Sequence, residues 1–190
     1  RVSVMGAAGR MGQRIIYYLS RDQNIKIVGA KEAERHHSLG IDAGIIAGVG
    51  EIGVPITSDI AESSFGADVI VDFSSPKSTL LNASYASGEG KSMVIGTTGF
   101  TEKEESELRH LCRGFPCVVS ANMSIGVNVM IEATRILART LGDEYDVEIF
   151  EAHHKHKVDS PSGTAIMIGQ AASEGLGRDF QEVARFERHG

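Results

Sequence analysis

The chain lacks several features that would assign it to a common class of protein. No apolar run approaches the roughly 20 residues that span a bilayer. Arg1 leads directly into a strand-like segment, so we expect neither a membrane span nor a signal peptide. Basic charge is not in excess either, because the formal net charge is −6 over 190 residues. Nucleic acids and membrane surfaces normally require a basic face, so we expect neither as a partner.

Cysteine is also scarce. Cys112 and Cys117 are the two cysteines of the chain, and there is no second pair to complete a zinc site of the usual kind. We therefore expect free thiols in a reducing compartment, and hence a cytoplasmic protein.

Strand-like and helix-like segments alternate over the first two-thirds of the chain. We expect strands at 2–5, 25–30, 54–57, 67–73, 93–95 and 117–120, and helices at 10–20, 75–88 and 101–111. Unbroken aliphatic runs such as Val69-Ile70-Val71 are typical of a parallel sheet that is covered on both faces. The alternation predicts an α/β fold with a doubly wound parallel sheet.

The pattern changes after Asn122, where a long helix is expected at 127–141. Its predicted buried face consists of Val127, Met130, Ile131, Thr134, Leu137, Ala138 and Leu141. A strand at 145–150 and a helix at 163–173 should follow. We expect a dinucleotide-binding domain over 1–122 and a second, α+β substrate-binding domain over 123–190.

A glycine-rich turn lies between the first predicted strand and the first helix. It reads Gly6-Ala7-Ala8-Gly9-Arg10-Met11-Gly12, a G-x-x-G-x-x-G spacing. Glycines at such a turn let the backbone approach a pyrophosphate, although they also serve close packing of helix on strand. Glu32 lies 20 residues after Gly12, where an acidic residue binds the ribose hydroxyls of NAD. Together they favour a dinucleotide site, with Arg10 facing either the phosphates or solvent.

The residues around Glu32 bear on the choice of nucleotide. Glu32 would repel a 2′-phosphate, and the next residue is Ala33 rather than a cation. NADH is therefore favoured, and NADPH stays open if Lys31 or Arg35 turns inward.

Three further loops follow predicted strands, and ligands of open α/β sheets bind beyond the carboxyl ends of strands. These loops contain Asp72-Phe73-Ser74, Gly96-Thr97-Thr98 and Ser120-Ala121-Asn122-Met123. Each alone is as consistent with a plain turn as with a cofactor contact, but together they predict a crevice.

The segment Glu151–Ala165, EAHHKHKVDSPSGTA, concentrates histidine and lysine in an acidic chain. His153 and Lys157 form a credible acid/base pair, and Ser162-Gly163-Thr164 could hold a carboxylate at a helix start. Adjacent histidines of an extended segment point to opposite sides, and the lysines would repel a cation, so a metal site is disfavoured. The alternative is a solvent-exposed polar loop with no catalytic or binding role.

The motifs VMGAAGRMG, VIGTTGF, SANMSIGVNVM and EAHHKHKVDSPSGTA occur in an order that resembles the 4-hydroxy-tetrahydrodipicolinate reductase (dihydrodipicolinate reductase) family. The resemblance implies a Rossmann domain, a substrate domain, and NAD(P)H-dependent reduction of a cyclic dicarboxylate in diaminopimelate and lysine biosynthesis. It implies cofactor contacts at Gly6, Ala7, Ala8, Gly9, Arg10, Met11, Glu32, Gly96, Thr97, Thr98, Ser120, Ala121, Asn122 and Met123.

The same resemblance places the catalytic pair on His153 and Lys157, and substrate contacts on His154, Ser162, Gly163 and Thr164. It implies a homotetramer. Family chains continue through several more strands, so the substrate domain is expected to be incomplete here. Two other functions remain open: an NAD(H)-binding module without turnover, and a zinc-dependent hydrolase that uses the histidines.

Overall fold

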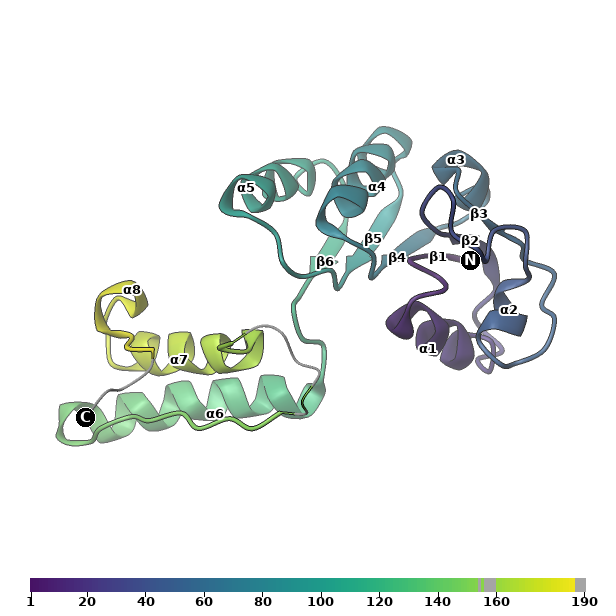
Figure 1. The fold of residues 1–190 in the computed structure, drawn as a ribbon. Helices are drawn as coiled ribbons and strands as arrows, with labels where there is room; N and C mark the ends of the chain where they lie inside the picture. Colours follow the sequence, from purple (N-terminus) through teal and green to yellow (C-terminus); the bar gives the residue numbers. More distant parts are fainter. Residues whose placement is uncertain (154, 156–159, 187–190) are drawn as a thin grey trace. The chain divides into compact units, whose positions relative to one another are not determined.

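The computed structural model describes residues 1–153, 155 and 160–186. The chain divides into two compact units, Arg1–Ser120 and Ala121–Gly190, and each is considered by itself (Figure 1).

The first unit is built on a parallel six-stranded sheet with the order β3-β2-β1-β4-β5-β6. The strands are β1 (Val2–Met5), β2 (Ile27–Lys31), β3 (Ile56–Thr57), β4 (Val69–Asp72), β5 (Ser92–Ile95) and β6 (Cys117–Val119). The helices are α1 (Arg10–Leu19), α2 (Ala43–Ile46), α3 (Ile60–Ser63), α4 (Pro76–Glu89) and α5 (Glu102–Leu111). Chain order reverses between β1 and β4, so the predicted doubly wound α/β fold is confirmed.

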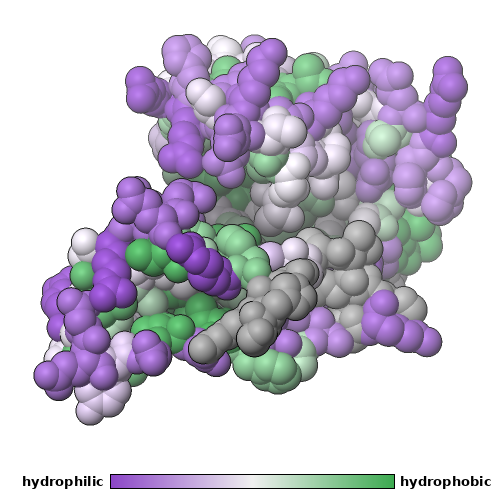
Figure 2. Space-filling view, turned by 60° about the vertical axis from the view of Figure 1, so that its left-hand side comes forward, coloured by the Kyte–Doolittle hydropathy of each residue, from purple (hydrophilic) through white to green (hydrophobic). Residues whose placement is uncertain are grey.

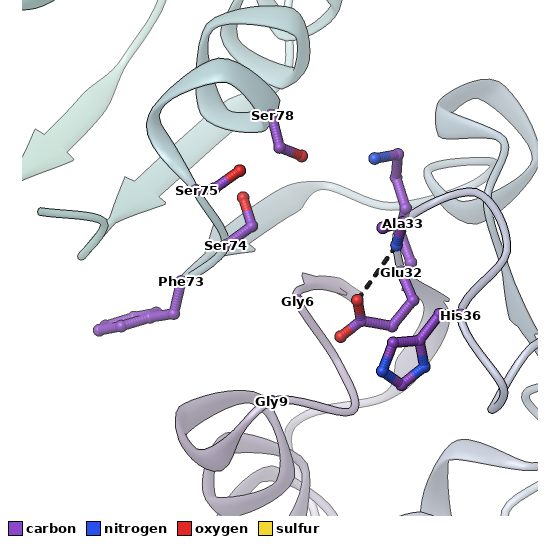
Figure 3. Close-up of a pocket in the computed structure, with 10 residues that line it drawn as sticks. Gly6, Gly9, Glu32, Ala33, His36, Phe73, Ser74, Ser75 and Ser78 are labelled. Atoms are coloured by element: carbon purple, nitrogen blue, oxygen red, sulfur yellow. Dashed lines mark hydrogen bonds between the residues drawn. The ribbon is translucent and has the colours of Figure 1, made fainter. Parts of the chain in front are cut away.

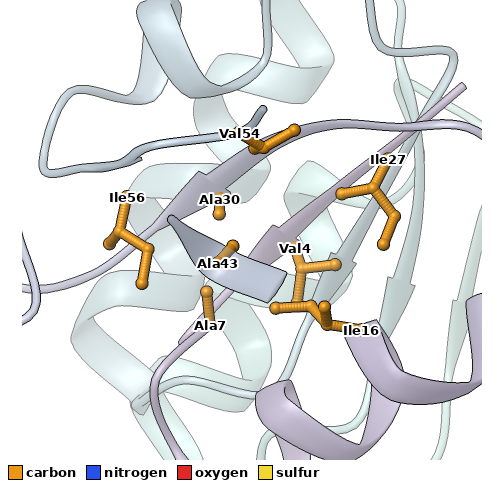
Figure 4. Packing of buried hydrophobic residues seen from close by; sticks show 8 residues of the cluster. All are labelled: Val4, Ala7, Ile16, Ile27, Ala30, Ala43, Val54 and Ile56. Carbon is orange, nitrogen blue, oxygen red and sulfur yellow. The ribbon is translucent and has the colours of Figure 1, made fainter. Parts of the chain in front are cut away.

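Neighbouring residues of a strand point to opposite faces of the sheet, and each face is covered by a buried hydrophobic cluster. Val4 of β1 packs with Ile16 of α1 and Ile56 of β3 in one cluster (Figure 4). Met5, the next residue, belongs to a second cluster that contains residues of α4 and α5. Val4 and Met5 are both fully buried, and burying a side chain of this size stabilises the fold by roughly 1.5–3 kcal/mol.

Local capping sets the helix boundaries of this unit. The predicted capping box is present, because the Thr101 hydroxyl accepts from the Glu104 N–H and the Glu104 carboxylate accepts from the Thr101 N–H. Helix α4 runs to Glu89, one residue past the predicted end, and is stopped by Gly90 in the left-handed region at φ +62°. The short helices α2 and α3 were not predicted, because four residues are too few to show a helical period.

The second unit contains helices α6 (Ile125–Leu141), α7 (Gly163–Gly175) and α8 (Phe180–Val183), with a 3₁₀ turn at Gly142–Glu144. Helix α6 packs against α7, and α7 packs against α8. The helices predicted at 127–141 and 163–173 are confirmed, each with an extra residue or two at its ends.

One prediction for this unit is wrong, and another is confirmed only in part. Residues 145–150 form no strand, because the described part of the chain offers them no neighbouring strand to pair with. The predicted buried face of α6 is covered only in part: Ala138 is buried and Val127, Ile131 and Thr134 are half-buried, but Met130, Leu137 and Leu141 are exposed. Helix α7 covers one stripe of α6 and leaves other apolar residues uncovered, so hydrophobic side chains lie on the surface of this unit (Figure 2). Among the described residues, no helix combines the length and the apolar character needed to cross a bilayer.

Candidate functional site

A pocket of about 340 Å³ lies in the first unit, beyond the carboxyl ends of β1, β2 and β4. This is the edge of the sheet at which open α/β folds bind ligands. The pocket is lined by Gly6, Gly9, Lys31, Glu32, Ala33, His36, Phe73, Ser74, Ser75 and Ser78 (Figure 3).

The glycine turn forms one wall, and its backbone tolerates no side chain at two positions. Gly6 has φ +71°, and a Cβ there would lie 2.8 Å from the Phe73 carbonyl oxygen. A Cβ on Gly12 would lie 2.1 Å from the Gly6 carbonyl oxygen, so Gly12 sets how closely α1 approaches the turn. Gly9 is the N-cap of α1 and has no side chain to accept from the N–H groups of the first turn, which are the groups that bind an anion at a helix start.

Glu32 is tied to the glycine turn. One carboxylate oxygen accepts from the Ala8 N–H at 2.9 Å, and the other accepts from the Ala33 N–H at 3.1 Å (Figure 3 shows the second bond). The two hydrogen bonds fix the negative charge of Glu32 in the pocket, directly beside the turn. The sequence predicted Glu32 as a ribose contact but gave no sign of its bond to Ala8, which is 24 residues away.

The opposite wall comes from the β4–α4 connection. Ser74, Ser75 and Ser78 lie on this side of the pocket, across from Glu32 and His36 (Figure 3). His36 accepts a hydrogen bond from the Ser38 N–H on Nδ1, at 3.2 Å. Ser75, Ser78 and His36 were not predicted as site residues from the sequence. The two serines could have been found from their place in the first turn of a helix that follows a strand, but no pattern distinguishes His36.

The predicted cofactor residues fall into three groups. Gly6, Gly9 and Glu32 line the pocket. Ala7, Ala8, Arg10, Met11, Gly96, Thr97, Thr98 and Ser120 belong to the same unit but not to the lining; Ala7 and Thr97 are buried, and Arg10, Met11 and Thr98 are exposed. Ala121, Asn122 and Met123 belong to the second unit. The structure therefore brings part of the predicted set together in one pocket.

In the second unit, Glu151 connects the histidine segment to the start of α7. One of its carboxylate oxygens accepts from the Ser162 N–H at 2.8 Å, and the other lies 3.7 Å from His153 Nδ1. Ser162 caps α7 by accepting from the Ala165 N–H at 3.0 Å. The Glu151 carboxylate is thus hydrogen-bonded to Ser162 and lies within ion-pair distance of His153. Glu151 was not assigned a role from the sequence, although a carboxylate two residues before His153 could have been predicted to lie near its side chain.

The start of α7 carries the other predicted substrate contacts. The Thr164 hydroxyl accepts from the Asn122 side chain at 3.1 Å, and a Cβ on Gly163 would meet no atom within 4 Å. A carboxylate could therefore approach the backbone of this helix start. His154 and Lys157 lie outside the described residues. Within residues 1–153, 155 and 160–186, no group of three or more His, Cys, Asp or Glu side chains is arranged to hold a metal ion.

Known proteins match this chain over its whole length. The family model "Dihydrodipicolinate reductase, N-terminus" matches residues 1–123, and "Dihydrodipicolinate reductase, C-terminus" matches residues 126–189. The relatives from Geotalea daltonii and Pelobacter propionicus, both named 4-hydroxy-tetrahydrodipicolinate reductase, are 47% and 45% identical over 190 residues. These matches span all of this chain and 71% of each relative.

A solved structure is similar as well. It is the dipicolinate-bound dihydrodipicolinate reductase from Paenisporosarcina sp. TG-14, with a TM-score of 0.71 and 26% sequence identity. The match covers 93% of this chain and 66% of that one. The motifs, the doubly wound sheet and these matches agree, and the chain belongs to the dihydrodipicolinate reductase family, NAD(P)H-dependent oxidoreductases of diaminopimelate and lysine biosynthesis.

Proposed function

We propose that this chain binds NADH in preference to NADPH and reduces 4-hydroxy-tetrahydrodipicolinate to tetrahydrodipicolinate. The observation that carries the proposal is the pocket in which Glu32 is fixed against the glycine turn, in a chain of this family. In this proposal residues 1–122 are the cofactor domain and residues 123–190 belong to the substrate domain. The assembly is a cytoplasmic homotetramer.

The pocket suits the adenosine end of the cofactor. The backbone of Gly6 to Met11 faces the phosphates, and the Glu32 carboxylate accepts from ribose hydroxyls while it retains its bond to Ala8. A 2′-phosphate would meet the fixed charge of Glu32, which is why NADH is the preferred form. Further contacts in the proposal are Gly96, Thr97, Thr98, Ser120, Ala121, Asn122 and Met123. The bound nucleotide supplies the hydride, and the protein positions it.

The second unit supplies protons and binds the dicarboxylate. His153 and Lys157 are the proposed acid/base pair, because an imidazole and an ammonium can donate a proton when negative charge develops on the substrate. His154, Ser162, Gly163 and Thr164 are the proposed substrate contacts, as donors at or near the start of α7. Glu151 orients His153 through their 3.7 Å contact.

Nucleotide preference tests the pocket assignment. Fluorescence titrations of the 190-residue chain should give a lower Kd for NADH than for NADPH. Glu32→Gln removes the fixed charge and should lower the ratio of the NADPH Kd to the NADH Kd at least several-fold. Glu34→Gln is the matched control, because Glu34 is exposed and does not line the pocket. An unchanged ratio in Glu32→Gln would contradict the role given to Glu32.

Turnover separates the reductase from the first of the two alternatives, an NAD(H)-binding module without turnover. The assay is the loss of NADH absorbance in the presence of enzymatically generated substrate. His153→Gln should lower kcat by about a hundredfold, in the range of general acid–base catalysis, and leave the NADH Kd within twofold. A collapse of NADH affinity with unchanged kcat would reverse the assignment of roles. Insensitivity of the wild type to chelators would argue against a zinc-dependent hydrolase.

A further inference from the structure

Asp72 is a buried carboxylate at the centre of the ligand-binding edge of the sheet. It is the last residue of β4 and is fully buried. In the sheet register it pairs with Met5 on one side and with Ile95 on the other. Met5 directly precedes the glycine turn, and Ile95 directly precedes Gly96-Thr97. Asp72 therefore lies between two of the loops to which the cofactor contacts are assigned.

The carboxylate of Asp72 collects donors from both sides of the β4–α4 connection. Its Oδ1 accepts from the Ser74 N–H at 2.9 Å and from the Ser74 hydroxyl at 2.6 Å. Its Oδ2 accepts from the Asn82 side-chain amide of α4 at 2.8 Å. Among the described residues, no cation lies within ion-pair distance of Asp72. These oriented donors all face one carboxylate, and hydrogen bonds to a charged acceptor are stronger than neutral ones.

Thr97 extends the network into the next loop. Its hydroxyl accepts from the Ser74 N–H at 3.1 Å and from the Thr79 hydroxyl at 2.8 Å, and it lies 3.4 Å from Asp72 Oδ1. Thr79 is fully buried, and Thr97 is nearly so. The hydroxyl of Thr97 thus fixes the β5–α5 loop to Ser74, a residue of the pocket wall.

Backbone packing joins the glycine turn to the same assembly. The Phe73 carbonyl and the Ser74 Cα leave no room for a Cβ on Gly6, and the Phe73 ring occupies the space of a Cβ on Gly96. If residues 73–75 shifted, their contacts with both the glycine turn at Gly6 and the β5–α5 loop at Gly96 would therefore change. Asp72 connects this segment to the rest of the fold, because its carboxylate accepts from Ser74 on one oxygen and from Asn82 of α4 on the other.

We propose that Asp72 is a positioning residue for the cofactor: its carboxylate, through Ser74 and Thr97, holds the β4–α4 and β5–α5 loops in the arrangement that binds NADH. The inference rests on the proposed function. Asp72 itself is covered by protein, so it acts through the loops and not by contact with the nucleotide.

The test compares three variants of the 190-residue chain by NADH fluorescence titration and thermal unfolding. Asp72→Asn keeps the shape and removes the charge. Asn82 Oδ1 is a buried atom with no hydrogen-bond partner among the described residues. A rotated Asn82 can accept from the new amide there, so this variant should fold. Thr79→Val keeps the shape and removes the hydroxyl that donates to Thr97. Ser3→Ala is the control, because it removes a buried hydrogen bond from β1 of the same sheet to the Ser63 carbonyl of α3 (2.7 Å), away from the pocket lining.

We expect Asp72→Asn to raise the Kd for NADH by about five- to tenfold, because charge-assisted hydrogen bonds become neutral ones of roughly half the strength. Thr79→Val should raise it by a smaller factor, and Ser3→Ala should lower the unfolding midpoint without changing the Kd. If Asp72→Asn did not fold, Thr79→Val would decide in its place. An unchanged NADH Kd together with a lower unfolding midpoint, in Asp72→Asn or in Thr79→Val if that variant has to replace it, would show that Asp72 has a structural role. That result would overturn this inference but not the proposed function. Absence of NADH binding by the wild type would overturn the proposed function and this inference together.

Discussion

Replacing Gly12 by alanine tests how closely α1 must approach the glycine turn. Gly12 is buried in the first turn of α1. The new methyl group would lie 2.1 Å from the Gly6 carbonyl oxygen and 2.7 Å from the Ala7 Cα. Both are backbone atoms, so no side chain can rotate away and the turn itself must move.

The size of the effect follows from this overlap. Overpacking of a closely packed site costs about 1–3 kcal/mol. In a chain of this length 1 kcal/mol shifts the unfolding midpoint by about 2–4 °C, so we expect a decrease of about 2–12 °C. The NADH Kd should rise as well, because the displaced turn carries the backbone that faces the phosphates.

A matched substitution gives the opposite sign. Gly88 also lies in a helix, but a Cβ there would meet no atom within 4 Å. Gly88→Ala should stabilise the chain by about 0.5–1 kcal/mol, because alanine loses less backbone entropy than glycine in a helix. Thermal unfolding followed by circular dichroism measures both variants. If Gly12→Ala unfolded at the wild-type midpoint and kept the NADH affinity, the reasoning about close approach would be refuted.

Three further predictions concern other parts of the chain. Burial alone would raise the pKa of Asp42, but hydrogen bonds from the N–H groups of Ile52, Val54, Gly44 and Ile45 lower it overall. The stabilisation by Asp42 should therefore be complete above the ordinary carboxyl pKa and fall as the pH drops through the lower folded value. Urea unfolding of Asp42→Asn and wild type at pH 7 and pH 3 should show the difference shrinking at the lower pH; a constant difference would contradict it. Burial, followed by the proximity of Cys117, raises the pKa of the Cys112 thiol to about 12. Iodoacetamide near pH 8 should therefore alkylate Cys112 only after the chain is denatured, which mass spectrometry of the tryptic peptide that contains Cys112 would show. Rapid labelling of Cys112 in the native chain would refute this. Finally, Glu151→Gln should lower kcat by about tenfold or more while the NADH Kd stays constant, because the carboxylate that orients His153 loses its charge. An unchanged kcat would remove Glu151 from the mechanism.

Local sequence signals predicted the first unit well. The β1–α1 glycine turn, the Thr101–Glu104 capping box and the strand predicted at 93–95 each depend on residues close together in the chain. Such features are visible as periods and short motifs. The second unit was predicted less well, because α6 and 145–150 were assigned a buried face and a strand. A strand at 145–150 requires a neighbouring strand that the described part of the chain does not provide, and α7 covers only part of the face predicted for α6.

The sequence by itself determined the doubly wound class and the family, and it selected Gly6, Gly9 and Glu32 of the pocket lining. These follow from hydrophobic alternation and from motifs whose chemistry is set by neighbouring residues. Only the tertiary structure decided that Glu32 binds Ala8, that Glu151 holds His153 and Ser162, and that Asp72 connects Ser74 to Thr97. The first and last of these join separate loops at the carboxyl ends of parallel strands. Residues distant in sequence meet there because the strands lie side by side, and no pattern along the chain records that geometry.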